Sequence, residues 1–73
     1  MTANQMLELT NRTPFEPLEI HLNNGTKIRV EHPYQIATQP RAAACIVYGD
    51  DDDVARFVAY RNIAEVITRA PTG

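Results

Sequence analysis

The sequence predicts a mostly β domain in which one short helix precedes about five antiparallel strands. Three observations lead to this prediction: a helix-capping pattern at the N-terminus, alternation of apolar and polar residues from position 18, and a glycine turn between the first two alternating stretches. The chain has 73 residues, the length of one small domain, and contains no internal repeat or low-complexity linker. We therefore treat residues 1–73 as a single domain.

The N-terminal segment is predicted to be helical over residues 3–11. Thr2 and Gln5 have the spacing of a capping box, in which each side chain bonds the backbone N–H of the other residue. Asn11 is a suitable end, and the proline three residues later excludes continuation. A helix this short is not stable alone in water, so we expect the face that carries Met6 to pack on the strands.

The rest of the chain is predicted to form strands separated by turns. A further short strand is expected within residues 34–38, after Pro33 interrupts the second strand. Residues 62–69 also fit helical spacing, but their β-branched content favours a strand, and helix is the alternative there. The five main strands are expected at residues 18–22, 26–31, 42–48, 54–60 and 64–69.

The register of the first hairpin follows from the alternation. A two-residue turn would place Ile20 opposite Arg29 and mix apolar with polar side chains on each face. A three-residue loop over residues 23–25, with Gly25 left-handed, instead places Ile20 opposite Ile28. We therefore expect the three-residue loop, with apolar residues on one face and charged residues on the other.

The small size of the chain predicts that it needs support beyond its own core. Burial in so short a chain barely offsets the conformational entropy of ordering it. Cys45 is the only cysteine, so no internal disulfide can form, and one cysteine with two histidines makes a structural zinc site unfavourable. We therefore expect no cofactor and a homo-oligomer.

Composition places the protein by default in the cytoplasm. Cys45 lies in an apolar run, as expected for a buried, inert thiol in a reducing compartment. The first residues lack the basic and apolar regions of a signal peptide, and no apolar stretch reaches the length of a membrane span. The formal net charge of −2 gives no general attraction to nucleic acid.

The four consecutive aspartates at 50–53 are the most conspicuous local feature. Aspartate is common in turns, and adjacent like charges discourage aggregation at a sheet edge. Calcium loops instead alternate their ligands and add a distant glutamate, and this segment has neither. We interpret the segment as the solvated tip of a hairpin between two strands, with ion binding as the alternative.

No constellation of catalytic residues is found, and we expect the protein not to be an enzyme. His21 faces Lys27 in the derived register, and His32 precedes a proline in a turn, so both are interpreted as structural or surface residues. The chain has no glycine-rich phosphate loop and no Ser/His/Asp arrangement.

Two motifs resemble those of the Sm-like family, in particular its Hfq-type branch. The stretch LEIHLNNGTKI at 18–28 resembles the first Sm motif, YQI at 34–36 resembles its later part, and VAYRNIAEV at 58–66 resembles the second motif. The resemblance implies a small SH3-like barrel of five strongly curved strands. It also implies rings, in which the fourth strand of one subunit pairs with the fifth strand of the next.

The same resemblance implies a site for single-stranded RNA. Tyr34 or Tyr60 would stack on bases, and Arg61 with Asn62 would contact phosphate or base edges, because Tyr60, Arg61 and Asn62 stand at the Tyr-Lys-His positions of the second motif. Gln35 stands in the matching stretch of the first motif. Asn62 replaces the histidine of Hfq-type proteins, and Val30 replaces a glycine that bends their second strand.

The chain also resembles a set of short bacterial proteins without an assigned activity. The shared pattern is Pro-Phe-x-Pro at 14–17, an alternating strand, Gly25, and Val-x-His-Pro at 30–33. This resemblance implies no function. The sequence therefore supports two hypotheses: a self-assembling Sm-like module that binds single-stranded RNA, or a structural and protein-interaction module that binds no nucleic acid.

Overall fold

The computed structural model describes residues 1–49 and 54–68. Within that part of the chain it contains one α-helix, two single-turn 3-10 helices (η1 and η2) and six strands. The elements, in chain order, are α1 (Ala3–Thr10), β1 (Leu18–Leu22), β2 (Lys27–Val30), η1 (Pro33–Gln35), β3 (Ile36–Ala37), β4 (Ala44–Tyr48), β5 (Ala55–Ala59), η2 (Tyr60–Asn62) and β6 (Ile63–Thr68).

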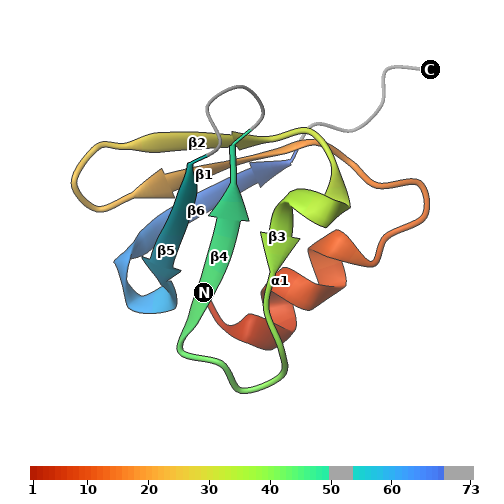
Figure 1. The fold of residues 1–73 in the computed structure, drawn as a ribbon, viewed down its shortest axis with the longest axis horizontal. Helices are drawn as coiled ribbons and strands as arrows, with labels where there is room; N and C mark the ends of the chain where they lie inside the picture. Colours follow the sequence, from red (N-terminus) through yellow and green to blue (C-terminus); the bar gives the residue numbers. More distant parts are fainter. Residues whose placement is uncertain (50–53, 69–73) are drawn as a thin grey trace.

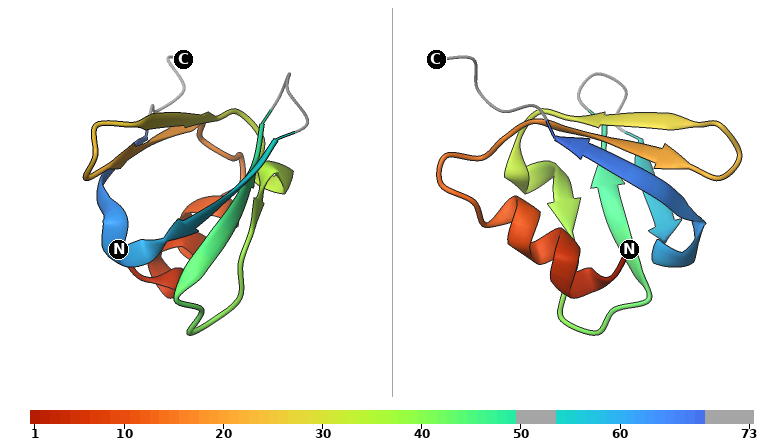
Figure 2. Two further views of the ribbon diagram at one scale, coloured as in Figure 1. Left: turned by 60° about the vertical axis from the view of Figure 1, so that its left-hand side comes forward. Right: turned by 180° about the vertical axis from the view of Figure 1, so that it is seen from behind.

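The strands form two antiparallel sheets of three strands each. The order is β2–β1–β6 in one sheet and β3–β4–β5 in the other. The two sheets cross steeply and face each other, and α1 lies beside them (Figures 1 and 2). The predicted mostly β class with one short N-terminal helix is confirmed. The expected barrel is not closed, because no ladder of hydrogen bonds joins the two sheets in the described residues.

The helix begins as the capping pattern predicts. The Thr2 hydroxyl accepts a hydrogen bond from the Gln5 backbone N–H at 3.2 Å, and the Gln5 side chain accepts one from the Thr2 N–H at 2.9 Å. The helix ends at Thr10, one residue before the expected boundary, with Asn11 as its C-cap. Met6 is fully buried, so the helix packs on the sheets through the expected face.

The register of the first hairpin is confirmed. Ile20 lies opposite Ile28, and Glu19 lies opposite Arg29. Gly25 has φ of 89°, the left-handed conformation that the three-residue loop requires and that glycine adopts without strain. The periodicity of the two strands therefore determined both the length of the turn and the face that each side chain occupies.

The second strand ends before Pro33 and does not continue through a bend. Residues 33–35 form the single turn η1, and the chain then resumes as β3, which is two residues long. The strand expected within residues 34–38 is thus shorter than that range, and it makes the number of strands six. Proline offers no N–H to a sheet and restricts the residue before it, which explains the interruption.

The other expected strands are each shifted by one or two residues. β4 begins at Ala44, because the preceding turn includes Arg41 in a left-handed conformation with φ of 67°. β5 ends at Ala59, where η2 starts. Residues 63–68 form a strand and not the alternative helix, because β1 pairs with every residue of the segment except Ala64, where the register shifts.

The core lies between the two sheets and α1. Its centre is formed by apolar residues of both sheets, and half-buried side chains such as Leu9 and Phe15 cover its margins. The largest fully buried side chains are Met6, Ile20, Val30, Val47 and Cys45. The expected burial of Cys45 is therefore confirmed.

Some predictions fall outside the described residues. The four aspartates at 50–53, with both their turn and ion-binding interpretations, and the expected strand end at Arg69 belong to this group. Within residues 1–49 and 54–68, no helix is long and apolar enough to cross a membrane.

Candidate functional site

The five residues predicted to bind RNA lie in two separate turns. Tyr34 and Gln35 belong to η1, whereas the other three form η2. Gln35 Nε2 donates a hydrogen bond to the Tyr48 carbonyl at 3.1 Å, and the Tyr60 N–H donates one to the Ala43 carbonyl at 3.0 Å. The two turns are therefore at opposite ends of β4, and their anchoring residues Ala43 and Tyr48 are separated by about 16 Å at 3.3 Å per residue. They do not form one continuous site within a single copy.

Gln35 is a structural residue and not a reader of bases. Its side chain is 3% exposed. Its Oε1 accepts hydrogen bonds from the backbone N–H groups of Glu31 and His32, both at 2.8 Å, while its Nε2 bonds Tyr48. The amide thus satisfies three backbone groups where β2 ends and η1 begins, and it has no surface to offer to a ligand.

Tyr60 is also buried and cannot stack on a base. Its residue is 4% exposed, and its hydroxyl donates a hydrogen bond of 2.6 Å to Oγ1 of Thr38. Burial raises the pKa of the Tyr60 phenol, as it does that of the neighbouring Cys45 thiol. Tyr60 belongs to the buried core, together with Cys45 and Val58. In this structure Tyr60 therefore has no exposed face on which a base could stack, and of the two tyrosines named for stacking only Tyr34 is accessible.

Tyr34 is the exposed member of the predicted group. Its side chain is 75% exposed, and its ring stacks on His32 with centroids 4.9 Å apart and an interplanar angle of 6°. The stack forms because Pro33 turns the chain so that residues on either side of it project together. The result is an aromatic pair at the surface of η1.

Arg61 and Asn62 are exposed, and shallow hollows lie on each side of their turn. One hollow, of about 400 Å³, is lined by Ala43, Ala44, Ala59, Tyr60 and Arg61. The other, of about 220 Å³, is lined by Leu22, Asn23, Asn24 and Asn62. The Arg61 and Asn62 carbonyls accept hydrogen bonds from Asn23, so the turn is held against the tip of the first hairpin.

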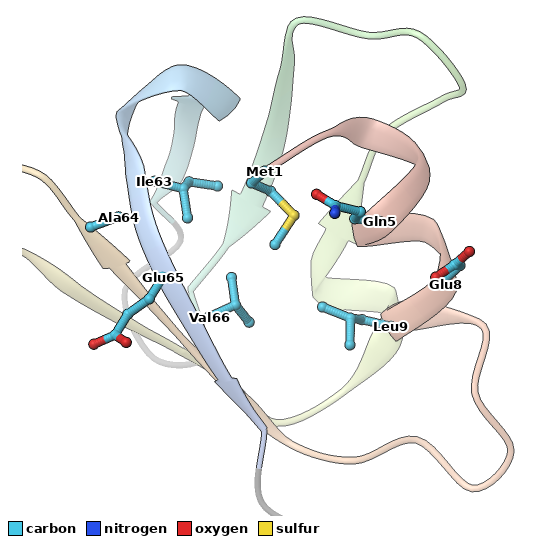
Figure 3. A pocket seen from close by; sticks show the side chains of 8 residues that line it. All are labelled: Met1, Gln5, Glu8, Leu9, Ile63, Ala64, Glu65 and Val66. Carbon is cyan, nitrogen blue, oxygen red and sulfur yellow. The ribbon is translucent and has the colours of Figure 1, made fainter.

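A third hollow runs between α1 and β6. It has a volume of about 350 Å³, and the side chains of Met1, Leu9 and Val66 point into it (Figure 3). Glu8 and Glu65 stand at its sides. Among the strands that the structure describes, β6 pairs only with β1, and the hollow borders the other side of β6. It is therefore a groove of mixed polarity beside an edge strand, with both apolar and polar side chains in its lining.

The outer face of the β2–β1–β6 sheet is charged and internally paired. His21 Nε2 lies 2.5 Å from Oε1 of Glu19, and His21 Nδ1 lies 3.4 Å from Oε1 of Glu65. Across the residues described, no three histidine, cysteine, aspartate or glutamate side chains are grouped so as to hold a metal ion. His21 acts here as a link between two strands.

One exposed apolar residue was not singled out by the sequence analysis. Phe57 on β5 is 79% exposed, more than any other large apolar side chain described. The sequence did contain a pattern that indicates an exposed apolar face, because β4 and β5 are apolar at nearly every position and not only at alternate ones. Such strands have apolar side chains on both faces, and only one face can meet the core of a small domain.

Comparisons with known proteins add no assignment. Neither protein-family models, curated proteins nor solved structures give a significant match to this chain. The interpretation of function therefore depends on the residues and their geometry.

Proposed function

We propose that the protein is a self-assembling structural and interaction module that associates through its edge strands. The observation that carries this proposal is the position of β5 and β6. Each is the last strand of its sheet and is paired on one side only among the described residues. A proposal of this kind gives the chain no catalytic role.

Edge strands favour association because they expose a row of N–H and C=O groups. β5 has five residues and β6 has six, so the two could pair over nearly their full lengths. A contact between β5 of one copy and β6 of the next is head-to-tail, and such contacts build a ring when the rotation closes. The Sm-like resemblance implies the same arrangement.

The groove between α1 and β6 supports this use of the edge. A strand added beside β6 would place alternate side chains toward α1, where Met1, Leu9 and Val66 form the apolar part of a mixed lining. Burial of these half-exposed side chains would add to the main-chain hydrogen bonds. The size of the chain supports the proposal as well, since a domain of 73 residues gains stability from an assembly.

Light scattering combined with hydrogen exchange tests the proposal. We expect an assembly of more than two copies at micromolar concentration. Outward-facing amides of β5 and β6 should exchange more slowly as concentration rises, whereas those of the β1–β2 hairpin should not change. A single folded copy whose β5 and β6 amides exchange rapidly at every concentration would contradict the proposal.

A second candidate function is binding of single-stranded RNA. It is supported by the exposed Tyr34–His32 stack and by Arg61, because aromatic faces and cations are what such sites use. Oligo-U and oligo-A should then bind more weakly as salt rises from about 50 mM to about 200 mM. Tyr34→Ala and Arg61→Ala should weaken binding, with Lys27→Ala on the other sheet as the control. Absence of binding at the lower salt would exclude this function.

The cytoplasm is the proposed location. The single thiol, Cys45, is buried and unpaired, and burial raises its pKa, which keeps it protonated and unreactive. A protein of this kind is compatible with a reducing compartment. Localisation of a tagged chain in cell fractions checks this assignment.

A further inference from the structure

The outer face of the β3–β4–β5 sheet is entirely apolar over the described residues. The register places Ala37, Ile46 and Phe57 in one row across the three strands. Rows on β4 and β5 pair Ala44 with Ala59 and Tyr48 with Ala55. We call this surface the alanine face, and its members are Ala37, Ala44, Ile46, Tyr48, Ala55, Phe57 and Ala59.

The alanine face is exposed because the core lies on the opposite side of the sheet. The alternating residues Cys45, Val47 and Val58 are buried between the sheets, whereas every member of the alanine face is exposed or half-buried. A sheet with apolar side chains on both sides is typical of strands that are covered on both sides. Among residues 1–49 and 54–68 of a single copy, only one side of this sheet is covered.

The outer face of the other sheet is charged, so an apolar outer face is specific to the β3–β4–β5 sheet. The outer face of β2–β1–β6 carries Glu19, His21 and Arg29. The His21 ring contacts Glu19 along β1 and Glu65 across to β6, and Arg29 forms an ion pair with Glu31. Ile67 is the exposed apolar residue on that face. The chain thus has one sheet face suited to water and one suited to a partner.

The shape of the alanine face favours a copy of itself as the partner. Phe57 is flanked along β5 by Ala55 and Ala59, so its ring projects beside two small side chains. About a two-fold axis, the ring of each copy can rest on the alanines of the other. The face carries no charged side chain, so two such faces bring no like charges together.

We infer that a second copy of the chain covers the alanine face in a two-fold contact. This contact goes beyond the proposed edge pairing and uses side chains instead of main-chain groups.

The area available for such a contact can be set against that of a stable interface. An aromatic ring buries about 150–250 Å². At 79% and 46% exposure, Phe57 and Tyr48 together offer roughly 250 Å² for burial, and the five smaller side chains add to this. A standard interface uses about 800 Å² per partner, so the contact should be weak unless edge pairing reinforces it.

Sedimentation measurements on Phe57→Ala test the inference. Truncation of a central aromatic side chain should raise the dissociation constant of the two-fold contact by about tenfold or more. Tyr34→Ala, an exposed aromatic truncation in η1 and outside both the alanine face and the two edge strands, is the matched control and should leave association unchanged. The Phe57 side chain is 79% exposed, so circular dichroism should show an unchanged fold in the variant.

The mass of the assembly separates this inference from the proposed edge pairing. If the wild-type protein is a dimer and Phe57→Ala is a monomer, the result supports the contact through the alanine face and contradicts the proposed edge pairing. If the wild-type protein is a larger closed assembly and Phe57→Ala halves its mass, the result supports both the contact through the alanine face and the edge pairing. An assembly that Phe57→Ala leaves intact overturns the inference, as does a wild-type monomer. A monomer that sediments with phospholipid vesicles through Phe57 also overturns it, because lipid would then be the occupant.

Discussion

The hydroxyl of Tyr60 donates a hydrogen bond of 2.6 Å to Oγ1 of Thr38, which joins η2 to the chain that follows β3. Thr38 in turn donates to the Ala44 carbonyl at 3.4 Å. The phenol therefore connects three segments at one end of the β3–β4–β5 sheet. This places Tyr60 among the residues that hold the fold, with its ring inside and its polar atom satisfied.

Tyr60→Phe should reduce stability without changing assembly or RNA binding. The substitution removes one partly buried hydrogen bond and keeps the ring, so the free energy of unfolding should fall by about 1 kcal/mol. Urea denaturation of both proteins measures the difference. A large loss of oligonucleotide affinity in a fully folded Tyr60→Phe variant would contradict the structural role.

Gln35→Ala should be much more destabilising than a typical surface substitution. It leaves the Glu31 and His32 N–H groups and the Tyr48 carbonyl without their side-chain partner, at about 1–3 kcal/mol for each group that stays buried and unsatisfied. We expect a total loss of about 2–4 kcal/mol, since water can reach part of the turn.

Gln39→Ala is the matched control for Gln35→Ala. Gln39 has the same side chain, lies four residues later and is exposed. Its truncation should change the free energy of unfolding by less than about 0.5 kcal/mol. Equal effects of the two substitutions in urea denaturation would show that the buried amide of Gln35 contributes nothing specific.

Two substitutions at left-handed positions should have opposite effects. Gly25 has φ of 89°, and a Cβ there would meet open space, so Gly25→Ala costs only backbone strain, about 1–2 kcal/mol. Arg41 has φ of 67°, so Arg41→Gly should relieve strain and raise the free energy of unfolding by up to about 1 kcal/mol. Thermal or urea unfolding of the two variants measures the sign of the change in the free energy of unfolding for each. Changes of the same sign would contradict the assigned turn conformations.

Stability should fall as the solution becomes alkaline. Burial raises the pKa values of Cys45 and Tyr60, so above the ordinary values of about 8.5 and about 10 the unfolded chain loses protons that the folded chain keeps. Their contribution is fully present below these ordinary values and is lost as pH rises toward the folded-state pKa values. Unfolding free energies between neutral pH and about pH 10.5 measure the slope.

Cys45→Ala separates the thiol from the other groups that titrate in this range. The variant is less stable at every pH, because a buried side chain is truncated, but its stability should fall less steeply between about pH 8.5 and about pH 10. An identical slope in the two proteins would show that Cys45 titrates alike in the folded and unfolded chains.

Local sequence was sufficient where one segment contains all the interacting groups. The capping box needs only Thr2 and Gln5, which are three residues apart, and it starts α1 as expected. The hairpin of β1 and β2 needs only the alternation of two neighbouring strands and a glycine between them, and its register was predicted residue by residue. In both cases the partners are close in the chain, so little loop-closure entropy opposes their contact.

Tertiary structure alone decided which residues of the candidate site are accessible. Tyr60 is buried because Ala43 and Thr38, both distant along the chain, meet η2. Gln35 is buried because the interrupted strand leaves two backbone N–H groups that its amide satisfies. Nothing in the motifs around these residues distinguishes a buried side chain from an exposed one.

The sequence by itself determined the helix, the alternating strands, the register of the first hairpin and the burial of the lone cysteine. The tertiary structure decided that the two sheets stay open and that Phe57 faces outward. The physical reason is that periodicity assigns side chains to two faces, but the packing of distant segments chooses which face becomes the core. Where β4 and β5 are apolar on both faces, local pattern could not make that choice.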